Sequence, residues 1–182
     1  MFTYENSHIS LRSAAQCLDN IVVIDGLSKS HAMSGWRMGW AVAPVELTAH
    51  LGNFAAMSMF GCPQFIQDAA AFALNNDEYY VRDMCARYQN RRDLVCERLE
   101  EIPRVKYLRP ESGMFIMVDI REINQDDKVF AQQLLDAESV SVLPGSAFGS
   151  STQGHVRISL VQPKDVLTEG CKRLERFVSH LG

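Results

Sequence analysis

Residues 26–40 read Gly-Leu-Ser-Lys-Ser-His-Ala-Met-Ser-Gly-Trp-Arg-Met-Gly-Trp and join two apolar runs. The run before them, Ile21–Ile24, shows no alternation, which is typical of a strand buried on both faces. The run that ends them, Met38–Ala43, predicts a second strand that stops before Pro44. Because few residues separate the two strands, we expect them to lie side by side and antiparallel. The start of the second strand should then lie beside the end of the first, as part of an α/β sheet.

Two side chains in this loop have chemistry that suits a cofactor. Lys29 follows the carboxyl end of the first predicted strand, where open α/β sheets usually hold ligands. A lysine amine that loses its proton can form an imine with a carbonyl. Arg37 precedes the second strand, and a guanidinium can bind a phosphate with two hydrogen bonds. Together they suit a cofactor with an aldehyde and a phosphate, while spacing alone also allows a solvated loop with two surface charges.

The rest of the chain predicts two domains. Residues 45–75 should form two helical pieces broken around Gly61–Pro63. A long amphipathic helix, with its arginines and glutamates on the exposed face, should follow and end before Pro103. The remaining elements should be strands at 105–108, 114–119, 140–143 and 156–160, and helices at 127–137 and after Pro163. We expect domains at 1–75, whose sheet has too few strands to be complete, and at 76–182, a compact α+β unit.

The composition excludes several functional classes. The formal net charge of −4 gives no general attraction to nucleic acid or to an anionic membrane. No apolar run reaches the roughly 18 residues of a membrane span, and the first residues lack the pattern of a secretion signal. The five cysteines show no metal-ligand spacing. They predict reduced thiols, no metal site and a cytoplasmic location.

The loop at 26–40 closely resembles the lysine motif of class I and II aminotransferases, which use pyridoxal 5'-phosphate (PLP). That motif is typically Ser-x-Ser-Lys followed by Met-x-Gly-Trp-Arg-x-Gly. The resemblance implies that Lys29 binds PLP covalently, that Ser28 lies beside it in the cofactor site, and that Arg37 binds the cofactor phosphate. Gly26 departs from the pattern, because many members have a phosphate-binding serine there. Its backbone N–H could still serve.

Two later segments resemble the same family in the same order. Residues 111–115 resemble a strand opening that lies near the substrate. Residues 142–149 and 155–160 resemble the family's Pro-Gly-x-x-Phe-Gly and Val-Arg-Ile-Ser pair, whose arginine holds the α-carboxylate of the amino acid. Side chains alternate along a strand, so Arg157 should face away from the apolar side and be free to bind a carboxylate. The alternative for Arg157 is a surface salt bridge.

The resemblance implies the C-terminal portion of PLP-dependent transferase fold type I, with a truncated large-domain sheet and a small α+β domain. The whole enzyme should move an amino group between an amino acid and a 2-keto acid. It should act as a homodimer, because residues 62–70 resemble the family's dimer-interface region. The family's Asp-x-x-Tyr pair, whose aspartate contacts the pyridine nitrogen, has no counterpart in residues 1–20. We therefore expect the isolated chain to be inactive.

Three alternatives remain open on the sequence. The same scaffold serves PLP-dependent lyases, such as carbon–sulfur lyases or aminocyclopropane-carboxylate-synthase-like enzymes, and the motifs do not separate these from aminotransferases. A second alternative is an aminotransferase-like regulatory domain, which an upstream helix-turn-helix would favour. A third is a purely structural piece. Preference among amino donors cannot be read from these residues.

Overall fold

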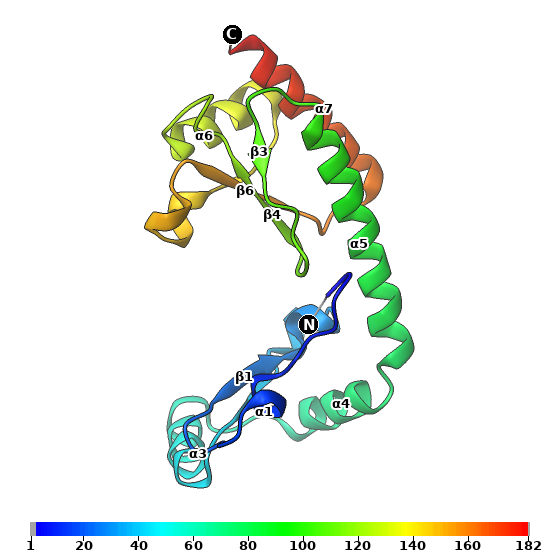
Figure 1. The fold of residues 1–182 in the computed structure, drawn as a ribbon. Helices are drawn as coiled ribbons and strands as arrows, with labels where there is room; N and C mark the ends of the chain where they lie inside the picture. Colours follow the sequence, from blue (N-terminus) through cyan, green and yellow to red (C-terminus); the bar gives the residue numbers. More distant parts are fainter. Residues whose placement is uncertain (1–2, 182) are drawn as a thin grey trace. The chain divides into compact units, whose positions relative to one another are not determined.

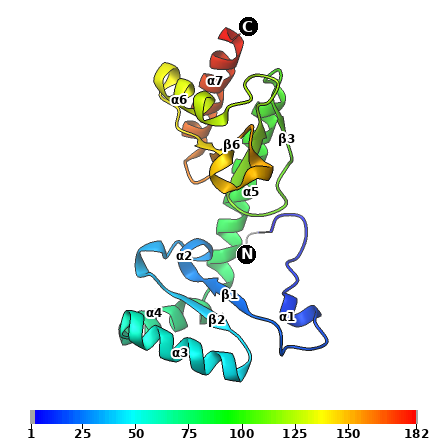
Figure 2. The same cartoon turned by 90° about the vertical axis from the view of Figure 1, so that its left-hand side faces the viewer.

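The computed structural model describes residues 3–181, and these divide into two compact units. Unit 1 contains residues 6–84, and unit 2 combines residues 3–5 with residues 85–181. Figures 1 and 2 show the elements of both units. Along the chain, the division between the units falls within helix α5 (Glu78–Glu100), after Met84. The assignment of domains to 1–75 and 76–182 stays a prediction.

Unit 1 contains a two-stranded antiparallel sheet. Strand β1 (Val23–Gly26) pairs with β2 (Gly39–Val42), and the last residue of β1 lies opposite the first residue of β2. The connection between them contains the single helical turn α2 (Leu27–Ser30) and the 3-10 turn η1 (Ser34–Trp36). The predicted antiparallel neighbours are therefore confirmed.

The prediction that Ile21–Ile24 forms a strand buried on both faces was wrong. The strand begins at Val23, and although Ile21 is buried, Ile24 is 81% exposed. The described residues of this sheet form only two strands. Without further strands or a covering layer, the side chains of β1 remain largely accessible to water.

The remaining helices of unit 1 are short or exposed. They are α1 (Leu11–Ala14), α3 (Val45–Met59) and α4 (Gln64–Asn75). The chain breaks between α3 and α4 as predicted, because Phe60 and Gly61 take left-handed backbone angles and Pro63 then precedes α4. No residue of α3 is buried.

Unit 2 is built on a four-stranded antiparallel sheet with the order β3-β4-β6-β5. The strands are β3 (Lys106–Tyr107), β4 (Phe115–Asp119), β5 (Leu143–Pro144) and β6 (His155–Ser159). The strand predicted at 140–143 begins only at Leu143 and has two residues. It lies at the edge of the sheet and pairs only with the middle of β6, so residues 140–142 have no partner strand.

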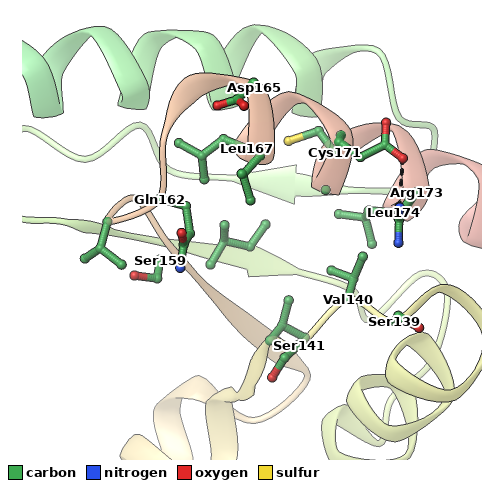
Figure 3. Close-up of a pocket in the computed structure, with 16 residues that line it drawn as sticks. Ser139, Val140, Ser141, Ser159, Gln162, Asp165, Leu167, Cys171, Arg173 and Leu174 are labelled. Atoms are coloured by element: carbon green, nitrogen blue, oxygen red, sulfur yellow. Dashed lines mark hydrogen bonds and ion pairs between the residues drawn. The ribbon is translucent and has the colours of Figure 1, made fainter.

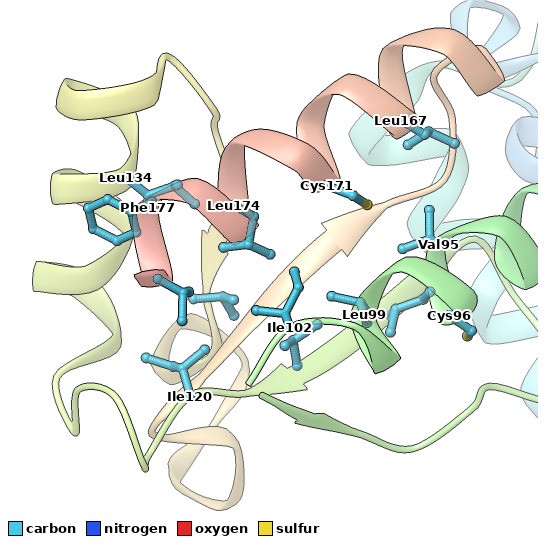
Figure 4. Packing of buried hydrophobic residues seen from close by; sticks show 14 of the residues in the cluster. Val95, Cys96, Leu99, Ile102, Ile120, Leu134, Leu167, Cys171, Leu174 and Phe177 are labelled. Atoms are coloured by element: carbon cyan, nitrogen blue, oxygen red, sulfur yellow. The ribbon is translucent and has the colours of Figure 1, made fainter. Parts of the chain in front are cut away.

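One hydrophobic core holds unit 2 together. Helices α5, α6 (Asp127–Glu138) and α7 (Lys164–His180) pack side chains against β4 and β6 (Figure 4). The residues with no exposed surface in this core are Val95, Cys96, Leu99, Ile116, Val118, Ile120, Phe130, Leu134, Val156, Leu160 and Val178. The sequence-based prediction of a compact α+β unit matches this architecture.

Helix α5 also buries a charge that its amphipathic pattern placed on the exposed face. Arg92 is only 1% exposed. Its guanidinium donates hydrogen bonds to Glu5 at 2.5 and 2.9 Å, to Asp93 at 2.8 Å and to the carbonyl of Pro110 at 3.0 Å. The ring of Tyr4 lies 4.5 Å from its Cζ atom. The hydrogen bond with Glu5 raises the pKa of Arg92, and the buried charge is thereby paired, as burial requires.

The core of unit 2 yields a stability prediction. Leu99→Ala should lower the free energy of unfolding by about 2–5 kcal/mol, because it leaves a cavity in a fully buried cluster. Urea unfolding followed by circular dichroism measures the change. The matched control is Leu108→Ala, at a leucine that is 86% exposed and should change stability by less than about 0.5 kcal/mol. Equal losses for the two variants would contradict this core assignment.

The exposed apolar side chains of unit 1 predict self-association of the chain. Phe54, Met57 and Phe60 are between 70% and 96% exposed, and contiguous exposed apolar surface favours association. We expect a dimer or larger species in sedimentation velocity. The double change Phe54→Glu and Met57→Glu should shift the chain toward monomer, whereas Leu108→Glu should not. A monomer over a broad range of concentrations would contradict the prediction.

Candidate active site

The structure places Lys29 just beyond the end of β1, as the sequence predicted. The helical turn α2 follows β1 without an intervening residue (Figure 2), and Lys29 is its third residue. Lys29 is exposed, and Ser28 beside it is half-buried. Among residues 3–181, the Lys29 amine has no hydrogen-bond or ion-pair partner. It is therefore available to react with a carbonyl group.

Arg37 lies at the other end of the same loop, directly before β2. Its backbone takes left-handed angles, with φ 52° and ψ 39°, a conformation that is uncommon outside glycine and that clusters at functional sites. Its Nη1 atom donates to the carbonyl of Ser34 at 2.8 Å. The guanidinium has five N–H donors, and the others have no partner in the described part of the chain. A phosphate could occupy them.

Gly26 has a structural reason for its departure from the family pattern. A Cβ atom at this position would lie 2.9 Å from the carbonyl oxygen of Met38 and 3.2 Å from the Cα atom of Gly39. A serine would therefore force β1 and β2 apart. The N–H of Gly26 donates to Asp25 Oδ1 at 2.7 Å, so in this structure it is already engaged and is not free for a phosphate.

Two residues after Lys29 tie the loop to other parts of unit 1. The Ser30 hydroxyl lies 2.9 Å from His31 Nδ1. His31 Nε2 lies 3.4 Å from a carboxylate oxygen of Asp77, and the His31 ring stacks on Tyr80 with 6.4 Å between ring centroids. The contacts of Ser30 and His31 are therefore with neighbouring side chains of unit 1.

The loop thus offers an unpaired amine and a guanidinium with free donors. These are the groups that an aldehyde and a phosphate require. The residues present therefore fit PLP. Lys29, Ser28 and Arg37 all belong to unit 1.

Arg157 lies in unit 2, in the middle of β6. The Cζ atom of its guanidinium lies over two phenyl rings, 4.1 Å from the centroid of Phe115 and 4.1 Å from that of Phe148. Rings at this distance attract a cation through their faces. Among residues 3–181, the Arg157 guanidinium has no ion pair and donates no hydrogen bond. The surface salt bridge considered as an alternative is therefore absent from this part of the chain, and the N–H groups can receive a carboxylate.

The two rings are the part of this site that sequence reasoning missed. Both residues belong to segments that resemble the family, at 111–115 and 142–149, but nothing in either segment shows that the rings meet at Arg157. Their approach depends on the pairing of β4 with β6 and on the loop after β5. Phe115 precedes Phe148 by 33 positions and Arg157 by 42 positions. Periodicity within one segment does not reveal that residues so far apart come together.

A separate cavity of about 610 Å³ lies in unit 2. Segment 139–142, the end of β6 and the first half of α7 line it, mostly with apolar side chains (Figure 3). The charged pair on its wall is internally satisfied, because Arg173 Nε donates to Glu169 at 2.8 Å. None of Ser28, Lys29, Arg37 and Arg157 lines this cavity. The chemistry of the proposed site therefore does not involve it.

Residues 3–181 contain neither a membrane-spanning helix nor a cluster of metal ligands. No described helix combines the length and the apolar character needed to cross a membrane. In the same residues, no three His, Cys, Asp or Glu side chains gather where they could hold a metal ion.

Comparisons with known proteins identify the family. A family model described as aminotransferase class I and II matches residues 1–174. The arginine–pyruvate transaminase AruH of Pseudomonas aeruginosa is 46% identical over 178 residues, which cover 98% of this chain and 45% of that protein. An aspartate aminotransferase of Pyrococcus horikoshii is 32% identical over 160 residues, which cover 87% of this chain and 41% of that protein.

Solved structures agree with the sequence relatives. An aromatic aminotransferase from Pyrococcus horikoshii superposes with a TM-score of 0.94 at 33% identity, over 98% of this chain and 48% of that one. An aspartate aminotransferase from Thermotoga maritima gives 0.89 at 30% identity, over 98% and 45%. The chain spans about half the length of the relatives it matches, and its predicted fold is confirmed.

The family match also confirms the predicted cofactor class, since these aminotransferases depend on PLP. By its sequence, its fold and the relatives that match nearly all of its length, this chain belongs to the aminotransferase class I and II family.

Proposed function

We propose that this chain is the C-terminal part of a PLP-dependent aminotransferase that moves an amino group between an amino acid and a 2-keto acid. One observation carries the proposal: an unpaired lysine amine stands at the end of β1, on the same loop as an arginine with free donors. The homologues named as aminotransferases support the reaction class. The substrates and the roles of single residues belong to the proposal.

Lys29 has two roles in this mechanism. It would hold the cofactor covalently. Once the amino acid has displaced it, its amine would take the proton from the substrate Cα atom as a general base and then deliver it to the cofactor carbon as a general acid. When bound, PLP draws in the electrons left at Cα after the proton has gone. The exposed position of Lys29 at the end of a helical turn leaves its side chain free for both roles.

The two arginines bind the charged ends of the reactants. Arg37 holds the cofactor phosphate through the donors that Ser34 leaves free. Arg157 holds the α-carboxylate of the amino acid, and a carboxylate matches a guanidinium with two parallel hydrogen bonds. The Arg157 Cζ atom lies 4.1 Å from the ring centroids of both Phe115 and Phe148. Because no side-chain hydrogen bond or ion pair in residues 3–181 engages its guanidinium, the N–H groups are left for the substrate.

The names of the relatives suggest which substrates to test first. The relative at 46% identity is named an arginine–pyruvate transaminase, and others are named for aspartate and for aromatic amino acids. We therefore propose arginine as the first amino donor to test and pyruvate as the first amino acceptor. A homodimer, which the resemblance of residues 62–70 implies, is part of the same proposal.

Lys29 is tested by chemical labelling of the full-length enzyme. With PLP bound, borohydride should fix the cofactor to one lysine, and peptide mapping should find it at Lys29. Lys29→Ala should lower kcat by at least about 10³-fold, because it removes the proton-transferring amine. Non-covalent PLP binding should be partly retained, because Arg37 remains.

The control for this experiment is Lys164→Ala, at the exposed first residue of α7, which should keep normal turnover. Label on Lys106, Lys128, Lys164 or Lys172 would overturn the site assignment. Release of ammonia and a keto acid without any amino acceptor would instead show a lyase on the same scaffold.

Steady-state kinetics and cofactor binding should distinguish the roles of Arg37 and Arg157. Arg157→Ala should lower kcat/KM for the amino acid by about a hundredfold, mainly through a higher KM, because a charged hydrogen-bond pair is lost. Its affinity for PLP should not change. Arg37→Ala should instead raise the Kd for PLP by about tenfold or more, as spectroscopic titration measures. The opposite assignment of effects would contradict the proposed roles.

A further inference from the structure

The loop that carries Phe148 is fastened to a buried carboxylate. Asp127, the first residue of α6, is 3% exposed. Its Oδ2 atom accepts hydrogen bonds from the backbone N–H groups of Ser146 and Gly154, both at 3.0 Å, and its Oδ1 atom accepts from the Ser146 hydroxyl at 2.6 Å. One side chain therefore binds both ends of residues 145–154.

Asp127 is buried and forms no ion pair within residues 3–181. Burial by itself raises the pKa of the Asp127 carboxyl, but the hydrogen bonds from Ser146 and Gly154 outweigh that effect and hold the pKa below its usual value. A buried charge is costly unless its hydrogen bonds are satisfied. The loop thus supplies the donors on which the ionised carboxylate depends, and the two stabilise each other.

The loop is also tied internally by contacts of Thr152 and Gly145. The Thr152 hydroxyl lies 2.7 Å from the carbonyl oxygen of Gly145 and 2.9 Å from that of Gly149, and its single proton is donated to one of them or shared by both. Gly145 packs so closely on the backbone of Thr152 and His155 that a Cβ atom would not fit. A change at the Asp127 anchor would therefore displace the turn that contains Phe148 rather than be absorbed inside the loop.

Displacement of the loop would move only one of the two rings beside Arg157. Phe115 belongs to β4, which pairs along its full length with β6, so its ring is fixed by the sheet. Phe148 ends the 3-10 turn η2 (Gly145–Phe148) and is fixed by the loop. The guanidinium lies 4.1 Å from each ring. Its orientation therefore depends on the loop through Phe148.

We propose that Asp127 is a positioning residue for substrate binding, which holds loop 145–154 so that Phe148 keeps the Arg157 guanidinium aimed at the substrate carboxylate. The inference rests on the proposed function, in which Arg157 binds that carboxylate. Asp127 itself contacts neither substrate nor cofactor in this scheme.

The decisive variants are Asp127→Ala and Asp127→Asn in the full-length enzyme. Asp127→Ala removes all three hydrogen bonds and should raise the KM for the amino acid about tenfold, with kcat within about twofold and an unchanged Kd for PLP. Asn can keep the geometry, because its amide oxygen can accept from both backbone N–H groups and its NH₂ can donate to the Ser146 hydroxyl. Its KM should stay near the wild-type value.

Asp126→Ala is the matched control. Asp126 is exposed and caps the same helix, accepting from the N–H groups of Lys128 at 3.0 Å and Val129 at 3.1 Å. Its loss weakens α6 without touching the loop, so the KM should not change. If both Asp126→Ala and Asp127→Ala raise the KM, a general weakening of α6 explains the effect and the proposal fails.

Two further measurements keep the test decisive. Ser146→Ala removes a single hydrogen bond, so it should fold even if Asp127→Ala does not, and it should raise the KM about threefold. Amide hydrogen exchange on the 182-residue chain should show faster exchange across residues 145–154 in Asp127→Ala but not in Asp126→Ala.

Together, these variants distinguish the proposed role of Arg157 in substrate binding from the proposed positioning role of Asp127. If Arg157→Ala leaves the KM unchanged, the proposed function of Arg157 fails. If Arg157→Ala raises the KM while Asp127→Ala and Ser146→Ala do not, only the positioning role of Asp127 fails.

Discussion

Strand β6 holds the core of unit 2 on one face and Arg157 on the other. Val156 and Leu160 have no exposed surface, and Ile158 packs against the same cluster. Because side chains alternate along a strand, a slip of one residue would turn the apolar set to water and drive the guanidinium into the core. Burial of each large apolar side chain contributes about 1.5–3 kcal/mol. The core therefore sets the register that presents Arg157.

In unit 1 the corresponding constraint is the close approach of two backbones. Gly26 and Gly39 lie opposite each other where β1 and β2 meet, and a Cβ atom at Gly26 would contact the neighbouring strand. The twelve residues between the two strands reverse the direction of the chain. Within this connection, Ala32 and Arg37 have positive φ angles, in the left-handed region. Such conformations cost about 1–3 kcal/mol each unless glycine adopts them. This unfavourable conformational free energy lies in the loop that contains Lys29.

The features that the sequence predicted correctly are local ones. The position of Lys29 after a strand, the break before Pro63 and the alternation around Arg157 each depend on a few consecutive residues. The features that it missed depend on partners far along the chain. Arg92 looked like a surface residue of an amphipathic helix, and its burial depends on Glu5, 87 positions away. In the same way, helix periodicity does not show which of two adjacent aspartates at the start of α6 faces inward.

Among the described residues of unit 2, the two buried charges are Arg92 and Asp127, and each holds a segment that carries one of the rings beside Arg157. Arg92 binds the carbonyl of Pro110, and the Tyr4 ring stacked on Arg92 belongs to a residue whose hydroxyl donates to the carbonyl of Gly113. These contacts fix the segment that leads into β4 and its first residue, Phe115. Asp127 fixes the loop that carries the other ring. Each is stabilised differently, Arg92 by ion pairs and Asp127 by neutral donors. Contacts with ring faces restrict the orientation of a guanidinium only weakly. The orientation of the Arg157 side chain therefore depends on the contacts that hold the two rings in place.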